Sequence, residues 1–514
     1  MRKRDGSMMT ATTIRTAAVF GTALALAGCA LGPDYQRPAT ALPSDFGAAA
    51  PVAASMAIPN DWWTLYNDPL LNDLVVGAVA NNPNIRLAIA RVDEARAALR
   101  ETNAAFFPEV DYSGVGARSR SGAAGGSVGG TTTSSATGRV FYGNFFRLDA
   151  GISYELDLWG KLRRASEASR AALLSTTYAR DVTTLALTST TAQAYFTLRS
   201  LDAQIAVTEG TLKAVGESLD IAQKRLKAGY SSALDYAQAE SLRAQTQVNL
   251  RELRRLRSVQ EHQLGNLTSN LSLRIAPGSI DSLPVPASPP PGLPSTLLER
   301  RPDVQRDEQT LVQANAEIGV AKAALFPTFG LTGAYGGQSF ELSDLLKAPF
   351  RFWNIGLGIT GPIFAGGKYI ARLDEAKARG SQQIAAYQTT VEGAFREVAD
   401  ALTNVAESNT AESEVMVQVE AARRTLRLSR LRYDAGYSAY LDVLDATRTA
   451  NLAELTRVQN RASRLNYSVA LVKALGGGWV DATRPASQPV SGAAASPTQV
   501  AMDAVPKPSA GTAR

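Results

Sequence analysis

Few residues in this sequence could carry out chemistry, and the one that stands out is Cys29. It is the only cysteine among 514 residues, so no internal disulfide can form, and His262 is the only histidine, which excludes the usual Cys/His metal sites. There is also no G-x-S-x-G nucleophile motif and no phosphate-binding loop motif. Paired carboxylates alone leave acid–base catalysis open, but the pattern as a whole predicts no enzyme, no cofactor and no metal site.

The residues before Cys29 have the pattern of an export signal. Basic residues at 2–4 and Arg15 precede an apolar run, Ala17–Ala27, that is too short to span a bilayer. The sequence "LAGC" resembles the site at which bacterial lipoproteins are cut and acylated. We therefore predict a signal peptide at 1–28, lipidation of Cys29, and a lipid-anchored extended segment at 29–59. A buried structural cysteine is the alternative.

Asp442 and Asp445 form a second group with possible chemistry, in "YDAGYSAYLDVLDATR". They are three residues apart, so a helix places both on one face, and a symmetric oligomer would gather them into a cation-binding ring. Asp442 has a simpler explanation, because an acid in a first helical turn interacts favourably with the helix dipole. Asp445 lies further into the helix and can meet Arg448 one turn on.

The elements that position these residues occur twice. "KAGYSSALDYAQAE" (227–240) returns as "DAGYSAYLDVLDAT" (434–447), at an offset of 207 residues (436 − 229), and "GK" at 160–161 returns at 367–368 with the same offset. We predict two repeats, 60–276 and 301–477. A Pro-rich segment, 277–300, joins them, and residues 478–514, which have no periodicity, are expected to form a disordered tail.

Each repeat contains strand patterns. Residues 146–158, "FRLDAGISYELDL", alternate apolar and polar side chains without a break, and weaker patterns occupy 110–115, 328–335 and 354–364. This length fits the roughly 9–11 tilted residues of an outer-membrane strand, with the apolar face toward lipid. Four strands cannot close a barrel, because the smallest membrane barrels need about eight. Other copies of the chain must therefore close the open edges.

Very long helices follow the strands. Residues 160–228 contain no proline and would extend roughly 100 Å as a helix, whereas the return helix, 232–270, reaches only about 58 Å. We expect the short helix 303–325 to stack on this return helix and to fill most of the gap. The second repeat follows the same plan with 367–435, 438–475 and the short helix 83–105. Gly229 and Gly436 are predicted helix stops, and Ser232 with Asp235 forms an S-x-x-D cap.

Composition excludes some functions. The formal charge of +6 falls to +3 (6 − 3) once residues 1–28 are removed, which is too weak for nucleic-acid binding. No other stretch reaches eighteen apolar residues. The 45% hydrophobic and 19% charged content suits long packed helices rather than a free coiled coil.

Four long motifs closely resemble the outer membrane factor family, in particular its TolC-like and NodT-type efflux lipoproteins. They are "CALGPDYQRP", "DWWTLYNDPLLNDLVVGAVANNPNIRLA", "ERRPDVQRDEQTLVQANAEIGVAKAALFPTFGLTGAYGG" and "LRLSRLRYDAGYSAYLDVLDATRTA". The resemblance runs from Cys29 to about Gly477. It implies an α+β membrane protein: a homotrimer whose twelve strands, four from each chain, form a barrel in outer-membrane lipid, continued by a long helical barrel in the periplasm.

The resemblance also implies a function. Such proteins are passive exit ducts of tripartite efflux systems in Gram-negative bacteria, and a periplasmic adaptor connects them to an inner-membrane pump of the RND or another type. The alternative is an anchored coiled-coil or adhesin lipoprotein, which would conduct no ions. The cargo stays open.

The resemblance assigns roles to several residues. Positions that match the family's closure network at the periplasmic tip are Tyr433, Asp442, Asp445 and Arg448. Ser438 departs from the pattern, since some members carry an arginine there. The tip turns that would contact the adaptor contain Gly229, Ser232, Asp235, Gly436 and Ser438. A turn that only reverses the chain is the alternative for these residues.

Overall fold

The computed structural model describes residues 30–40, 43, 46, 58–121, 141–287 and 297–478. The predicted signal peptide, Cys29, part of the Pro-rich segment and nearly all of the predicted tail lie outside these residues. The predictions made for them therefore stay predictions.

The two halves of the chain have the same order of α-helices and strands, but their short 3-10 helices lie at different positions. The first contains η1 (Trp62–Tyr66), α2 (Pro69–Asn81), α3 (Pro83–Ala104), β1 (Glu109–Ser121), β2 (Phe141–Leu156), α4 (Lys161–Lys227) and α5 (Ala233–Leu267). The second contains α6 (Leu297–Arg300), α7 (Pro302–Ala323), β3 (Thr328–Ser339), η3 (Leu342–Asp344), η4 (Ala348–Phe350), β4 (Arg351–Thr360), α8 (Lys368–Asp434) and α9 (Tyr440–Ala474). Corresponding helices have equal lengths, 22 residues in α3 and α7, 67 in α4 and α8, and 35 in α5 and α9.

The long helices end where the sequence predicts. Gly229 and Gly436 adopt φ angles of 77° and 79°, the left-handed conformation that glycine accepts most readily after a helix. At the start of α5, the Asp235 amide donates to the Ser232 hydroxyl at 3.1 Å, and the Ser232 amide donates to the Asp235 carboxylate at 3.4 Å. This is the predicted capping box. None of the described helices is long and apolar enough to cross a membrane.

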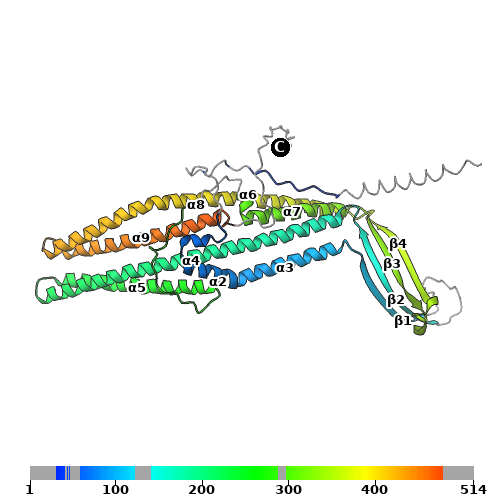
Figure 1. The fold of residues 1–514 in the computed structure, drawn as a ribbon, viewed down its shortest axis with the longest axis horizontal. Coiled ribbons are helices and arrows are strands. Elements are labelled where there is room, and N and C mark those ends of the chain that lie inside the picture. Colours follow the sequence, from blue (N-terminus) through cyan, green and yellow to red (C-terminus); the bar gives the residue numbers. More distant parts are fainter. Residues whose placement is uncertain are drawn as a thin grey trace, which may run out of the picture. The chain divides into compact units, whose positions relative to one another are not determined.

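The four strands form one antiparallel sheet in the order β1-β2-β3-β4. The prediction of four strands is confirmed, although their bounds differ from those predicted. Only one long edge of β1 and of β4 is paired within the described chain. Figure 1 shows the sheet at one end of α4 and α8, and both chain reversals at the other end.

Each short helix continues a return helix, but the pairing differs from the predicted one. The Asn82 amide group, at the start of α3, donates to the Leu267 carbonyl at the end of α5 at 2.9 Å. Arg301, at the start of α7, donates to the Ala474 carbonyl at the end of α9 at 3.0 Å. Thus α3 stacks on α5 and α7 on α9 (Figure 1). The prediction was wrong because both short helices have the same length, so helix length could not distinguish them.

The main core lies halfway along α4, where η1, α2, α5, α9 and residues 275–283 meet. Tyr195, Phe196 and Leu198 are fully buried there, and Tyr66 shares a hydrogen bond with Ser468 at 2.6 Å. Asp202 accepts from Arg257 at 2.6 Å and pairs with Arg199 at 3.1 Å. The same two arginines donate to the carbonyls of Ile275 and Ala276, which attaches the segment after α5 to the helices.

Candidate functional site

One face of the sheet is apolar and exposed to its surroundings. The register aligns Ile152 with Val110 on one side and, through Gly333, with Ile355 on the other. Tyr112 and Trp353, near the two edges of the sheet, are 88% and 73% exposed. Further large apolar side chains of this face are exposed as well: Leu148, Leu331, Tyr335, Leu357 and Ile359. A soluble protein rarely presents so continuous an apolar surface, whereas a lipid environment stabilises it.

The opposite face of the sheet is polar. The Arg147 guanidinium donates to the Asp149 carboxylate at 2.7 Å and lies 4.6 Å from the centre of the Phe352 ring. Asp149 is buried and also accepts from the Ser113 hydroxyl at 3.0 Å. Charged and hydroxyl groups on this side, against apolar groups on the other, are the alternation of a strand between lipid and water.

The polar face continues onto the helices. Glu155, near the end of β2, accepts a hydrogen bond from the Lys161 ammonium at 3.0 Å. Lys161 begins α4, and Ala165 and Ala168 follow it at spacings that place all three on one side of the helix. One surface therefore runs from the polar side of the sheet down α4.

The N-terminal segment, residues 30–37, lies against α4 and α7. The Leu31 amide donates to the Trp159 carbonyl at 3.0 Å, and Asp34 pairs with Arg164 at 2.7 Å. Arg37 donates twice to Glu308, at 2.8 and 2.7 Å. Glu308 is buried, and the hydrogen bond it accepts holds the pKa of Arg37 above its ordinary value despite partial burial. This geometry places residue 30, directly after Cys29, next to the junction of sheet and helices.

The predicted tip residues lie at the two chain reversals. Gly229, Ser232 and Asp235 occupy the turn between α4 and α5 and the start of α5. Gly436 and Ser438 lie between α8 and α9. The Ser438 hydroxyl is buried without a hydrogen-bond partner in the described part of the chain.

Tyr433 connects the two helices of the second reversal. Its ring centre lies 5.3 Å from that of Tyr440, at the start of α9. Burial raises the pKa of Tyr440, and the neighbouring Tyr433 raises it further. The two rings thus pack between the end of α8 and the start of α9. The resemblance assigns a role to Tyr433 but not to Tyr440.

Asp442, Asp445 and Arg448 lie on one exposed face of α9. Among the described residues, none of the three side chains forms an ion pair or hydrogen bond. The pairing of Asp445 with Arg448 that the spacing suggested is therefore absent in the single chain. Both carboxylates are free to face an axis or a partner.

Arg225 is a tip residue that sequence reasoning missed. Its guanidinium lies 4.8 Å from the centre of the Tyr433 ring and 3.4 Å from the Asp434 carboxylate, so it joins the end of α4 to the end of α8. A cavity of about 150 Å³ lies beside this contact, with Glu217, Arg430 and Tyr440 among its lining residues. The sequence repeat hints at this contact only indirectly. It places the ends of α4 and α8 at corresponding positions, but it does not indicate that they touch.

In the described residues, no group of three His, Cys, Asp or Glu side chains could hold a metal ion.

Known proteins are similar to this chain in both sequence and fold. The probable efflux pump outer membrane protein TtgC of Pseudomonas putida is 34% identical over 483 residues, covering 91% of this chain and 97% of that protein. The cation efflux system protein CusC of Escherichia coli K12 is 34% identical over 467 residues, covering 89% and 98%. The solved CmeC outer membrane channel of Campylobacter jejuni superposes with a TM-score of 0.81 at 27% identity, covering 88% of this chain and 95% of CmeC.

The outer membrane efflux protein family matches residues 74–270 and 293–477, most of the described chain. This match agrees with the two-faced sheet and the long helices that continue it. The chain therefore belongs to the outer membrane efflux protein family and is an outer-membrane efflux channel.

Proposed function

We propose that the protein is the passive exit duct of a tripartite efflux system and works as a homotrimer. The observation that carries this proposal is the sheet, which has one apolar face, one polar face and an unpaired edge on both β1 and β4. An open sheet edge inside a bilayer leaves backbone groups without partners, at a cost of several kcal/mol per group. Pairing β4 of one copy with β1 of the next satisfies every edge, and three copies close a barrel of twelve strands.

The shared order of α-helices and strands, and the equal lengths of the long helices, support a duplicated repeat. In a trimer this duplication gives six pairs of long helices around one axis, close to sixfold symmetry. The helical surface that continues the polar face of the sheet would then line a water-filled passage.

The oligomeric state can be tested without any assumption about cargo. Native mass spectrometry of the full-length protein, extracted in mild detergent, should give three times the mass of the mature chain. A monomer that remains fully helical and stable would contradict the proposed closure.

The second reversal is the proposed gate. Asp442 and Asp445 of three chains would place six carboxylates around the narrow periplasmic opening, with Tyr433 and Arg448 beside them. Opening requires the tip helices to move apart when a partner binds the open state more tightly, which is a population shift rather than a powered step. We also propose that the turns at Gly229, Ser232, Asp235, Gly436 and Ser438 contact the periplasmic adaptor, which links the duct to an inner-membrane pump.

Lipidation of Cys29 belongs to the same proposal. Residues 30–37 are attached to the helices next to the membrane end of α4, so a modified Cys29 would lie at the bilayer surface. A single acyl chain binds membranes only marginally, whereas several hold firmly, so the anchor would assist insertion rather than replace the barrel. Mass spectrometry of the mature N-terminus should find acylated Cys29, and an unmodified cysteine there would refute the anchor.

A further inference from the structure

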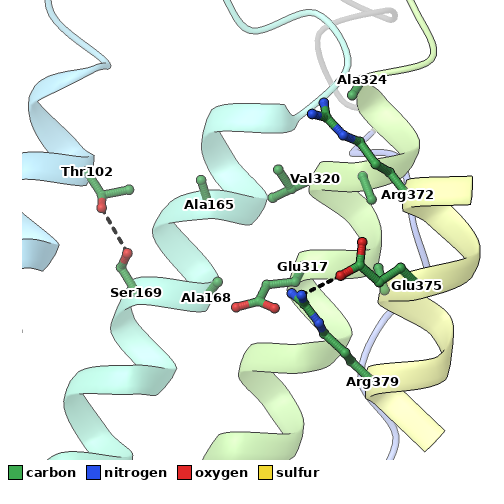
Figure 2. Close-up of a pocket in the computed structure, with 12 residues that line it drawn as sticks. Thr102, Ala165, Ala168, Ser169, Glu317, Val320, Ala324, Arg372, Glu375 and Arg379 are labelled. Carbon is green, nitrogen blue, oxygen red and sulfur yellow. Dashed lines mark hydrogen bonds and ion pairs between the residues drawn. The ribbon is translucent and has the colours of Figure 1, made fainter. Parts of the chain in front are cut away.

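A recess of about 480 Å³ opens between α3, α4, α7 and α8, near the end of these helices that adjoins the sheet (Figure 2). Its apolar lining consists of small side chains: Ala165, Ala168, Val320, Ala321, Ala324 and Ala376. Four charged side chains, from α7 and α8, lie around this lining. The volume falls within the roughly 300–1,000 Å³ that is usual for small-molecule sites.

The recess lies on the polar side of the helices. On α7, Glu308, Asn315 and Gly319 contact the N-terminal segment, whereas Val320, Ala321 and Ala324 line the recess from the opposite face of the helix. On α4, the recess residues Ala165 and Ala168 share a side with Lys161, whose ammonium pairs with Glu155 on the polar face of the sheet. The recess therefore faces the same side as the proposed lumen.

The charges around the recess are unevenly satisfied. Arg379 donates to Glu375 at 2.5 Å, and Glu317 accepts from Gln313 at 3.0 Å. Arg372 forms no ion pair within the described residues, and its guanidinium lies 5.8 Å from the centre of the Tyr369 ring. Figure 2 shows Arg379 turned toward Glu317 and Glu375, while Arg372 stands apart from them near Ala324. One unneutralised cation thus borders an apolar surface.

We propose that this recess is a lumenal binding site for amphipathic organic anions. The apolar body of the ligand would cover the alanine and valine side chains, and its acidic group would form a charge-assisted hydrogen bond with Arg372. A site this open binds weakly, as a conducting pathway requires, because a passing molecule must also leave. The inference rests on the proposed function, in which this surface lines the path of the cargo, and a trimer would contain three such sites.

Single-channel recording of the full-length protein in planar bilayers tests the site, with naphthalene-2-sulfonate as the probe and uncharged 2-naphthylmethanol as its comparison. Transient blockades by the sulfonate, absent with the alcohol, are expected in the wild type. In Arg372→Ala the apparent affinity should fall about tenfold with conductance unchanged. Arg372→Lys should retain an intermediate affinity because it keeps the positive charge.

Two further variants separate this site from general effects. Lys377→Ala removes the same charge from an exposed position of α8 that does not line the recess, and should leave the blockades unchanged. Ala321→Phe fills the recess and should abolish them without altering the trimer mass.

Blockades that persist in both Arg372→Ala and Ala321→Phe, that are equal for the uncharged alcohol, or that are absent in a conducting wild type would overturn the site. Loss of the trimer in Ala321→Phe would instead show that a second copy covers the recess, which also overturns it. A wild type without any conductance would refute the duct itself.

Discussion

The Arg225 guanidinium, at the end of α4, lies 4.8 Å from the centre of the Tyr433 ring, at the end of α8. The same guanidinium reaches the Asp434 carboxylate at 3.4 Å. This contact joins the two helical reversals of one chain at the end far from the sheet. It holds the second reversal, which leads into the first turns of α9 with Asp442 and Asp445, against the first.

Removing this contact should favour the open tip. Arg225→Ala loses a surface ion pair of about 0.2–1 kcal/mol and a cation–π contact of about 0.5–1 kcal/mol, so the open population should rise roughly three- to thirtyfold. The measurement is the open probability in planar bilayers. Lys227→Ala, which removes an exposed charge from the same helix end, is the matched control. Equal open probability in both variants would place the restraint elsewhere.

The carboxylates of α9 should bind multivalent cations. Because Asp442 and Asp445 are exposed and unpaired in the single chain, a trimer leaves them free to coordinate a trivalent ion from the periplasmic side. Asp445→Ala should abolish the block, and Asp442→Ala should weaken it. The same block in Asp442→Ala/Asp445→Ala as in the parent would move the gate to another part of the chain.

Arg301 connects three helices and should be important for stability. It is only 7% exposed, pairs with Asp303 at 2.6 Å and with Glu397 at 2.7 Å, and donates to the Ala474 carbonyl. Arg301→Ala leaves the Ala474 carbonyl and the mostly buried Asp303 carboxylate without their partner, at a cost of about 1–3 kcal/mol, so the variant should have a lower melting temperature. Arg306→Ala, on the same helix, loses only the half-exposed pair with Asp307, worth at most about 1 kcal/mol. Similar melting temperatures for the two variants would contradict this assignment.

The same network predicts a pH dependence. Burial alone would raise the pKa of Asp303, but the hydrogen bond and charge of Arg301 outweigh it and hold that pKa below its usual 3.8. A lowered carboxyl pKa stabilises the folded state fully above pH 3.8, and this contribution is lost as the pH falls through the folded value. The stability difference between the wild type and Asp303→Asn should therefore be constant near neutral pH and shrink below about pH 3.8. A difference that grows on acidification would contradict the direction of the shift.

The N-terminal segment depends on a glycine. A Cβ atom at Gly319 would lie 2.7 Å from the Leu31 carbonyl oxygen, so Gly319→Ala should displace residues 30–37 from α7. Hydrogen exchange in this segment should then be at least about tenfold faster, because the Leu31 amide loses its bond to Trp159. Gly210→Ala has nothing within 4 Å of the added atom and is the control. Unchanged exchange in Gly319→Ala would show that the segment is held by its ion pairs alone.

Local patterns predicted the elements well and failed where the decisive contacts are distant. The alternation at 146–158 identified β2, but the strand ends at Leu156, because the Asp157 carboxylate accepts from the Leu162 amide at the start of α4. The strand also begins earlier than predicted, at Phe141. The predicted strand begins only at 146 because two consecutive apolar residues, Phe145 and Phe146, interrupt the alternation.

The candidate site shows the same limit. Asp442, Asp445 and the two turns could be found from spacing and resemblance, because those signals are local. Arg225 could not, since its partner Asp434 is 209 residues away and no pattern within either helix announces the contact. The stacking of α3 on α5 was missed for a related reason: only contacts between elements distinguish two helices of equal length.

In the proposed function, this chain forms a conducting duct that is closed at its periplasmic tip. The most direct test is the conductance of purified full-length trimers in planar bilayers, measured in the wild type and in Asp442→Ala/Asp445→Ala with a trivalent cation added on the periplasmic side. Discrete channels are expected in both, with block in the wild type alone. Correctly folded trimers that produce no channels would refute the proposed duct and favour an anchored adhesin.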